Sequence, residues 1–265
     1  MSGDPTRRAY AGAGQCWADD AMLAYGPLAA HLVELCPLPL GGATALDAGA
    51  GTGAVGAILR DRGAFVVACD LEADMLRHSI RRPGNGAAAV ADVAALPLRS
   101  GSFDVVLAAF VLNHVVDPAG ALRELRRLTR RGGYVLASVF GEHRAPAKDA
   151  VDEVLTNHGW QPPRWARTLH ERAAAVATPH LMAAAARAGG WPDIDICADI
   201  AEVDVGLDSA DLVVRYRLGM PQVSSFYSGL HAAAQAAVFA QATRAVEQVG
   251  CSFRPAVVEL VARVS

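Results

Sequence analysis

Three glycines at alternate positions, with an aspartate just before them, form the pattern in this sequence that most clearly indicates a binding site. Gly49, Gly51 and Gly53 follow Asp47, which lies at the end of a short apolar run. Glycine has no Cβ, so the backbone can turn sharply there and a ligand can lie against it. Apolar positions resume after the glycines and continue to Leu59, which predicts a helix whose first N–H groups point at the same ligand. The pattern predicts a strand, a glycine-rich turn and a helix that together hold a small molecule.

Two further aspartates close apolar runs that predict the next strands. Asp70 follows the run 65–69, and Asp92 follows the weaker run 87–91. In nucleotide-binding folds an acid about 20 residues past the glycines accepts hydrogen bonds from both ribose hydroxyls, and Asp70 stands at this position. Additional strands are predicted at 102–107 and 131–136.

Predicted strands and helices alternate over residues 43–140, which indicates an α/β fold. Such alternation is typical of parallel strands with right-handed crossovers and helices on both faces of a doubly wound sheet. Ligands of these sheets bind beyond the carboxyl ends of the strands, where the strand order reverses. We therefore expect Asp47, Asp70, Asp92 and the segment 108–114 to converge on one crevice.

Taken together, these motifs resemble class I S-adenosylmethionine-dependent methyltransferases. The resemblance is closest to the small-molecule group (methyltransferase type 11) that includes quinone-biosynthesis enzymes and many natural-product methyltransferases, and it covers residues 43–140. Asp47 and the three glycines match the pattern Asp-x-Gly-x-Gly-x-Gly, whereas the Asp47 carboxylate would repel the pyrophosphate of a nicotinamide cofactor. The resemblance implies a Rossmann-like, seven-stranded, mostly parallel sheet with an antiparallel final strand. It also implies S-adenosylmethionine as the cofactor and S-adenosylhomocysteine as its product.

The resemblance further implies how the cofactor would be held. The glycine turn would lie under its methionine and ribose portions, Asp70 would accept from the ribose diol, and Asp92 would accept from the adenine amino group. For Asp92 the alternative is a local turn closed by its own side chain. The expected cofactor-binding residues are Asp47, Gly49, Gly51, Gly53, Asp70, Leu71, Asp92, Val93 and Phe110.

Two histidines are candidates for a catalytic role. His114 follows the strand that leads to the transferred methyl group in the resembled family, and His143 follows the fourth predicted strand. A base at either position would help a hydroxyl acceptor, whereas a carbon or amine nucleophile needs little more than alignment. Each histidine can equally be a packing or surface residue, and His114 can instead orient the cofactor. No cluster with metal-ligand spacing is present in the sequence, so we expect no metal.

Helical patterns flank the predicted core. The N-terminal segment, with Tyr10 and Trp17, is either a flap over the cofactor or a helix packed on the edge of the sheet. Thr178 and Pro179 predict the N-cap and the first residue of a later helix. The expected division of the chain is 1–42 N-terminal helical flap, 43–140 cofactor-binding core, 141–178 helical insertion (lid), 179–206 core helix and strand, 207–252 helical lid, and 253–265 final core strand.

The helical insertions would cover the strand ends, bind the acceptor and exclude water. Their aromatic residues and few charges indicate a largely apolar acceptor of moderate size. A dimer interface is the alternative for 208–250, so we expect a monomer or a homodimer. The expected acceptor contacts are Tyr10, Trp17, Asn113, Trp160, Phe226, Tyr227 and His231.

Composition limits the other functions that the chain can have. Its 265 residues are 52% hydrophobic and 19% charged, which suffices for one sizeable core and an elaboration of it. A net charge of -3 without a basic run argues against a nucleic-acid partner. No apolar stretch reaches the roughly 20 residues that span a membrane, and no apolar leader is present, so we expect a cytoplasmic location. The five cysteines are far apart and include no Cys-x-x-Cys pair, which predicts free thiols.

We therefore expect methyl transfer from S-adenosylmethionine to a hydroxyl, an amine or an activated carbon of a small-molecule metabolite. The alanine- and arginine-rich, lysine-poor composition is typical of GC-rich bacterial genomes and favours a role in secondary, natural-product metabolism. The alternative is a non-methylating cyclase or rearrangement enzyme that keeps the cofactor pocket. A non-catalytic module is disfavoured because the glycine turn and all three acids are intact, and a nicotinamide oxidoreductase is disfavoured by Asp47.

Overall fold

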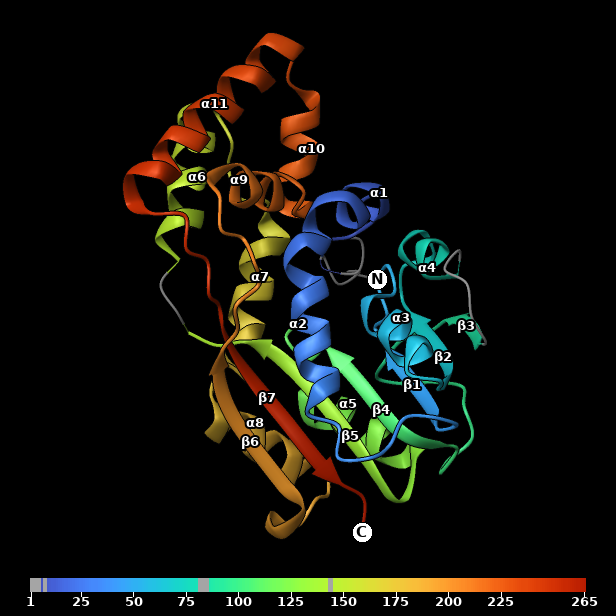
Figure 1. The fold of residues 1–265 in the computed structure, drawn as a ribbon. Coiled ribbons are helices and arrows are strands. Elements are labelled where there is room, and N and C mark those ends of the chain that lie inside the picture. The colour runs from blue at the N-terminus through green and yellow to red at the C-terminus, as the bar shows by residue number, and fades with distance from the viewer. Residues whose placement is uncertain (1–5, 7–8, 81–85, 143–144) are drawn as a thin grey trace.

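Seven strands form a single sheet within the residues that the computed structural model describes, which are 6, 9–80, 86–142 and 145–265 (Figure 1). Their order across the sheet is β3-β2-β1-β4-β5-β7-β6. The strands are β1 (Thr44–Ala48), β2 (Phe65–Asp70), β3 (Gly86–Val90), β4 (Phe103–Ala109), β5 (Thr129–Phe140), β6 (Ile196–Glu202) and β7 (Ala256–Arg263).

The strand order reverses at β1, which pairs in parallel with β2 on one side and β4 on the other. Strands β1 to β5 all run parallel, whereas β7 is antiparallel to both β5 and β6, and its arrow in Figure 1 points opposite to those of β4 and β5. The predicted fold class, a doubly wound, mostly parallel seven-stranded sheet with an antiparallel final strand, is therefore confirmed.

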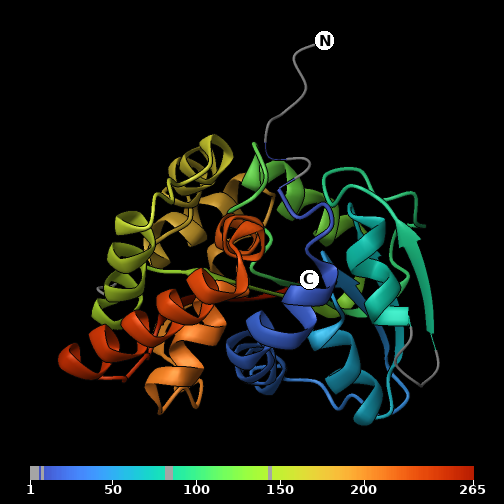
Figure 2. The same cartoon turned by 90° about the horizontal axis from the view of Figure 1, so that it is seen from above.

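Helices cover both faces of the sheet (Figure 2). On one face Leu32 and Leu59 pack against the strands, and on the other Leu122 and Met182 do so. Strands β1 and β4 are almost fully buried, which is typical of parallel strands covered on both sides. The helices involved are α2 (Met22–Glu34) and α3 (Ala54–Asp61) on the first face, α5 (Pro118–Leu128) and α8 (Pro179–Ala188) on the second, and α4 (Ala73–Ile80) beside β2 and β3.

Local signals fix where these helices begin. Thr178 accepts a hydrogen bond from the Leu181 N–H at 3.3 Å, and Pro179 is the first residue of α8, so the predicted helix start is confirmed. Asp117 caps α5 in the same way, accepting from the Gly120 N–H at 2.9 Å. Both side chains satisfy N–H groups that a helix leaves without a partner at its first turn.

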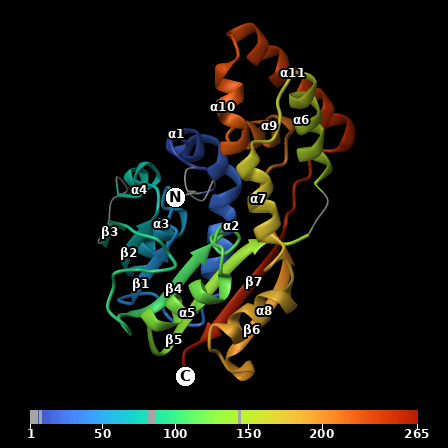
Figure 3. The ribbon, with the colours of Figure 1, turned by 180° about the vertical axis from the view of Figure 1, so that it is seen from behind.

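Five helices outside the α/β alternation, which we call the insertion helices, follow β5 and β6 in the chain. Figures 1 and 3 show most of them gathered beyond the ends at which β4 and β5 point. The insertion helices are α6 (Pro146–Asn157), α7 (Arg164–Ala173), α9 (Ala210–Leu218), α10 (Pro221–Gly229) and α11 (Ala232–Val249); a short 3-10 helix, η2 (Asp193–Asp195), precedes β6.

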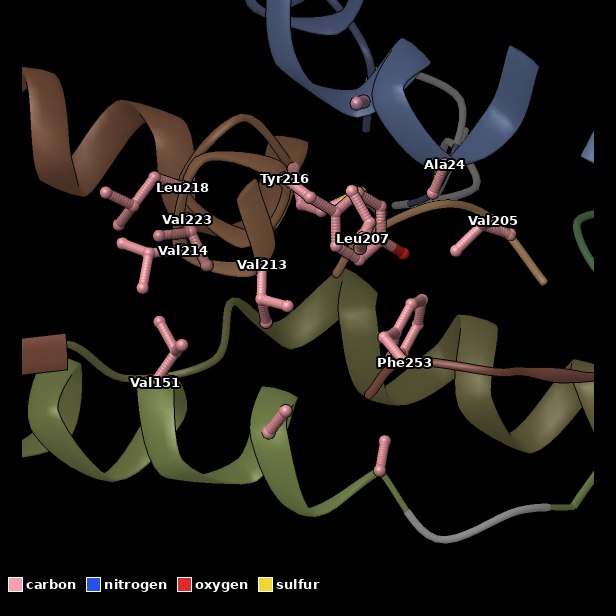
Figure 4. Packing of buried hydrophobic residues seen from close by; sticks show 14 of the residues in the cluster. Ala24, Val151, Val205, Leu207, Val213, Val214, Tyr216, Leu218, Val223 and Phe253 are labelled. Carbon is pink, nitrogen blue, oxygen red and sulfur yellow. The ribbon is translucent and has the colours of Figure 1, made fainter. Parts of the chain in front are cut away.

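The insertion helices have a hydrophobic core of their own. Figure 4 shows Val151 of α6 facing Val213 and Val214 of α9, and the rings of Tyr216 and Phe253 pack with centroids 5.3 Å apart. The same cluster continues to Ala24 of α2, so these helices pack on the N-terminal part of the chain.

A buried ion pair lies inside the insertion helices. Arg217 of α9 is 4% exposed, donates to Asp152 of α6 at 2.5 Å and stacks over the Trp160 ring at 5.5 Å. Loss of Asp152 would leave the buried Arg217 charge without this partner, so the pair fixes α6 against α9.

The N-terminal segment runs between the sheet core and the insertion helices. It contains α1 (Gly14–Cys16) and a single π-helical turn, η1 (Trp17–Ala21), before α2. The Gly14 N–H donates to Asp74 of α4 at 3.2 Å, and Asp20 accepts from Arg215 of α9 at 2.9 Å. The segment is thus hydrogen-bonded both to a helix of the sheet core and to an insertion helix.

Cys16, Cys36, Cys69, Cys197 and Cys251 are all free thiols, as predicted. Among the described residues no helix is long and apolar enough to cross a membrane, and no three potential ligands come together around a metal position.

Candidate functional site

A cavity of about 1190 Å³ opens beyond the carboxyl ends of β1, β2 and β4, where the strand order reverses. Sites for one drug-sized ligand measure about 300–1,000 Å³, so this cavity is large enough for two small molecules. The structure brings eleven of the candidate residues together in its wall: Tyr10, Trp17, Asp47, Gly49, Gly51, Asp70, Leu71, Asp92, Val93, Phe110 and His114.

The glycine turn has the left-handed backbone that its sequence predicted. Gly49, Gly51 and Gly53 have φ angles of 74°, 52° and 86°. A Cβ at Gly49 would overlap the Val111 side chain, and a Cβ at Gly53 would lie 2.5 Å from the Ser79 hydroxyl. Both conformation and packing therefore require glycine at these two positions. Gly53 is the residue before α3 and does not itself line the cavity.

Asp70 is held by two backbone N–H groups. One carboxylate oxygen accepts from Gly51 at 2.7 Å and the other accepts from Glu72 at 2.8 Å. Burial raises the pKa of the Asp70 carboxyl, and the two N–H groups oppose that rise. Each carboxylate oxygen has two lone pairs, so both can accept a further hydrogen bond from a ligand in the cavity.

Asp47 is the most deeply buried acid of the site, with 1% of its surface exposed. It accepts from the Gly56 N–H at 2.8 Å. Burial raises the pKa of the Asp47 carboxyl to about 7, and the neighbouring Asp70 adds to the rise. A cationic group in the cavity would favour the ionised form, because opposite charges at close range stabilise each other.

Asp92 and its neighbours also line the cavity. The Asp92 carboxylate accepts from the Ala94 N–H at 3.0 Å, so the local turn considered as an alternative does form. This bond leaves further lone pairs for a ligand, and the adenine contact stays a prediction. Val93 is buried beside Asp92, whereas Leu71 is 40% exposed at the cavity edge.

A chain of packed aromatic rings also lines the cavity. Phe110 packs edge-on against Tyr25 with ring centroids 5.2 Å apart, and Trp17 packs edge-on against Tyr10 at 5.4 Å. Between these pairs, Tyr25 packs against Trp17 at 4.6 Å with the rings tilted. Phe110 has a φ of 56°, which is unusual for a residue with a side chain and is typical of functional sites. Tyr25 and Met22 line the cavity but were not predicted to do so. In the sequence these two residues belong only to the apolar pattern of α2, and such a pattern does not distinguish a residue of the core from one that lines a cavity.

His114 and Tyr10 contact each other in the cavity wall. The Tyr10 hydroxyl lies 3.3 Å from His114 Nε2, and the rings meet edge-on at 5.4 Å. Burial, and to a smaller extent Arg172 on α7, lower the pKa of the His114 ring to about 4. The ring is therefore neutral at neutral pH, and it can accept a proton or simply pack.

Five predicted acceptor contacts are not part of the cavity wall. Trp160 donates to the Gln222 carbonyl at 2.9 Å, Tyr227 donates to the Gln235 carbonyl at 3.3 Å, and His231 Nδ1 accepts from the Ala234 N–H at the start of α11. These contacts stabilise the insertion helices. Phe226 and Asn113 also lie outside the wall, and all five assignments stay predictions.

His143, the second catalytic candidate, lies outside the described residues. The structure therefore leaves the expected role of this side chain as a prediction.

Part of the chain is similar in sequence to known proteins. Residues 46–137, which contain β2 to β4 and most of β1 and β5, match a family described as a methyltransferase domain. The demethylmenaquinone methyltransferase of Beutenbergia cavernae is 38% identical over 99 residues, which are 37% of this chain and 41% of that protein. The chain thus spans about two fifths of the length of the curated relatives it matches first.

Solved structures share the fold over most of the chain. A putative methyltransferase from an antibiotic biosynthesis pathway of Anabaena variabilis has a TM-score of 0.60 at 16% identity and covers 88% of this chain and 95% of that one. The cyclase SpnF has a TM-score of 0.53 at 17% identity and covers 91% and 81%. At these identities the likeness shows the fold alone.

Proposed function

We propose that the protein is an S-adenosylmethionine-dependent methyltransferase, because residues 46–137 match a family described as a methyltransferase domain. Its acceptor is a largely apolar small molecule of moderate size, methylated on a hydroxyl, an amine or an activated carbon. The relative named demethylmenaquinone methyltransferase supports this class of reaction.

The observation that carries the proposal is that an acidic, glycine-rich surface and an aromatic wall share one cavity. Asp47 and Asp70 line this cavity together with Tyr10, Trp17 and Phe110. Acids favour the ammonium of the cofactor, and aromatic faces favour a cation held near them. Both effects therefore favour a cationic ligand in this cavity.

The polar groups on the acidic side fit this cofactor. Asp70 offers two fixed acceptor oxygens, which suit the two hydroxyls of a ribose. Gly51 exposes backbone rather than a side chain to the cavity, so a ligand can approach closely. Val93 supplies an apolar contact for a planar base, and Asp92 supplies an acceptor next to it.

The residues of this chain would bind, align and shield the reactants. When bound, S-adenosylmethionine supplies a methyl group attached to a positively charged sulfur. Holding an acceptor in line with that methyl group contributes on the order of 7–11 kcal/mol through effective molarity. Tyr10, Trp17 and Tyr25 exclude water from the same space, which strengthens every electrostatic interaction inside it.

His114 takes the role of proton acceptor when the acceptor group is a hydroxyl. Its ring lines the cavity, is neutral at neutral pH and is oriented by the Tyr10 hydroxyl. A base whose pKa is about 4 is weak at neutral pH. Its contribution to the rate therefore belongs at the low end of the roughly 100- to 10,000-fold enhancement that general base catalysis gives. For an amine or carbon nucleophile the ring only positions the acceptor.

The alternative function keeps the cofactor pocket and catalyses a cyclisation or rearrangement. SpnF, named as a cyclase, supports it because the same fold serves that chemistry there. Formation of S-adenosylhomocysteine during turnover distinguishes the two functions. An acceptor that is converted while S-adenosylmethionine stays intact would favour the cyclase.

Calorimetric binding of S-adenosylmethionine, S-adenosylhomocysteine and NAD to one folded sample tests the proposal. We expect micromolar binding of the two sulfur ligands and none of NAD. Binding of NAD alone would overturn the cofactor assignment. Once binding is established, apolar hydroxyl, amine and activated-carbon compounds can be screened for methyl transfer.

The cellular setting is a further part of the proposal. The description of the Anabaena variabilis protein supports a role in natural-product biosynthesis, as does the composition of this chain. We keep a monomer or a homodimer as the expected state, which light scattering on the purified protein can test. The cytoplasmic location and the lack of a nucleic-acid partner stay predictions of the sequence.

A further inference from the structure

Arg172 joins three segments that are far apart in the chain. It lies half-buried on α7, and its Nη1 donates to the Thr6 hydroxyl at 2.7 Å and to the His114 carbonyl oxygen at 3.0 Å. Thr6 and His114 both line the cavity, whereas Arg172 lies behind them. One guanidinium therefore fixes two parts of the cavity wall to an insertion helix.

Helix α7 has little apolar packing of its own. Leu169 is its one buried residue, and its Trp165 ring lies 6.4 Å from the Tyr10 ring. A helix with few buried contacts opens at low free energy unless polar contacts hold it. Because Arg172 and Trp165 both contact the N-terminal segment, the position of α7 and the position of that segment depend on each other.

The two groups that Arg172 holds are on either side of the Tyr10–His114 contact. It bonds the backbone of His114 directly, and it holds Thr6, which lies four residues before Tyr10. A shift of either segment would change the 3.3 Å distance between the Tyr10 hydroxyl and His114 Nε2.

We propose that Arg172 is a positioning residue: it holds the N-terminal segment and the His114 loop on α7 and so sets the Tyr10–His114 contact. This inference rests on the proposed function, because it states how that site is kept in its working geometry. Arg172 is not in the cavity wall, so it acts through Thr6 and His114 and not by touching a ligand there.

Hydrogen exchange of the cofactor-free protein tests the role of Arg172 without any activity. Arg172→Gln removes the cation and both hydrogen bonds, and Arg167→Gln changes an exposed arginine on the same helix as the matched control. We expect peptides covering 9–17 and 110–116 to exchange at least about tenfold faster in Arg172→Gln, which is the effect of one charge-assisted bond. Exchange as slow as in Arg167→Gln would overturn the proposal.

A second variant keeps the test decisive if Arg172→Gln folds poorly. Thr6→Val removes one acceptor but leaves α7 and the bond to His114 in place. We expect faster exchange in 9–17 and unchanged exchange in 110–116. The double variant should exchange no faster in 9–17 than Arg172→Gln alone, because the two substitutions break the same bond. Additive effects would contradict a direct link.

A functional readout separates positioning from a general structural role. Among the described residues, the titratable and charged groups that act on the His114 ring are Tyr10 from the N-terminal segment and Arg172 from α7. Without the guanidinium, protonation of the ring is easier, so the acid limb of the rate–pH profile should move to higher pH in Arg172→Gln. Arg172→Lys keeps the charge and should restore the limb and part of the rate. An unmoved limb in Arg172→Gln would contradict action through His114.

Separate measurements test the proposed function and the role of Arg172. If the wild-type protein does not bind S-adenosylhomocysteine, the proposed function fails. The exchange comparison among wild type, Arg172→Gln and Arg167→Gln still decides whether Arg172 holds the wall.

Discussion

The Asp70 carboxylate accepts the backbone N–H of Gly51 at 2.7 Å, which joins the end of β2 to the turn that follows β1. The residue expected to hold the ribose therefore also shapes the glycine turn on which the cofactor would lie. Its second oxygen accepts from Glu72, so the side chain has one orientation before any ligand binds. Such preorganisation lowers the entropy that binding must overcome.

Asp70→Ala should weaken binding of S-adenosylhomocysteine by about 100-fold or more, because two charge-assisted hydrogen bonds of about 1.5–3 kcal/mol each are lost. Calorimetry gives the affinity, and circular dichroism checks the fold. Asp61→Ala is the control, since Asp61 is exposed at the end of α3 and lies outside the cavity wall. Unchanged affinity in a folded Asp70→Ala protein would remove the ribose assignment.

Gly49→Ala should destabilise the fold more than Gly42→Ala. Both glycines have a left-handed φ, 74° and 79°, but a Cβ at Gly42 meets nothing within 4 Å, whereas one at Gly49 overlaps Val111. We expect a loss of about 1–2 kcal/mol for Gly42→Ala from the backbone alone, and about 1–3 kcal/mol more for Gly49→Ala from overpacking. Urea denaturation measures both.

The packing part of this difference can be isolated. Val111→Ala in the Gly49→Ala background should recover part of the lost stability, because it removes the overlapping methyl groups. Equal losses in the two glycine variants would show that the Val111 contact is unimportant.

Binding of S-adenosylmethionine should release a proton from Asp47. Its carboxyl has a pKa of about 7 in the free protein, and the cationic ligand favours the ionised form. The dissociation constant should therefore rise as pH falls below about 7, approaching tenfold per pH unit. Calorimetry in buffers of different ionisation enthalpy counts the proton, and Asp47→Asn should bind with neither the proton release nor the pH dependence.

The same carboxyl affects folding with the opposite trend. Its pKa is raised from 3.8 to about 7 on folding, so the folded state binds more protons between those values. The contribution of Asp47 to stability is thus present at low pH and is lost as pH rises through this window.

His114 should make the protein less stable in mild acid. Its pKa falls from 6.5 in the unfolded chain to about 4 in the fold, so the unfolded state binds more protons between these values. Stability therefore decreases as pH drops through this window, by about 1–2 kcal/mol after allowance for the partial exposure of the ring. Urea denaturation at several pH values should show this loss in His180→Gln, an exposed control, and not in His114→Gln.

The core of the site could be predicted because its signals are local. Gly49, Gly51 and Gly53 must be glycine for backbone reasons, and Thr178 with Pro179 fixes a helix start within a few residues. Asp70 follows from its place at a strand end. The parallel sheet then brings these residues together, because the carboxyl ends of neighbouring strands meet at one edge.

The acceptor side is harder to predict, because aromatic residues serve cores and binding sites alike. Trp160, an expected acceptor contact, packs on Arg217 inside the insertion helices, and its assignment stays a prediction. Tyr25 lines the cavity although its sequence context is that of a core helix. Arg172 meets Thr6 across 166 positions of the chain, and no local pattern indicates such a contact.

Strand β7 comes after β1 to β6 in the chain, yet it lies inside the sheet between β5 and β6. During synthesis β6 emerges first and has no neighbour to pair with until β7 has left the ribosome. The sheet edge beyond β5 therefore stays open until β7 is available to pair with it. Without β7, β6 would have no strand to pair with and the edge of β5 would be exposed. A truncated product should therefore be a substrate for chaperones and proteases rather than a partly active enzyme.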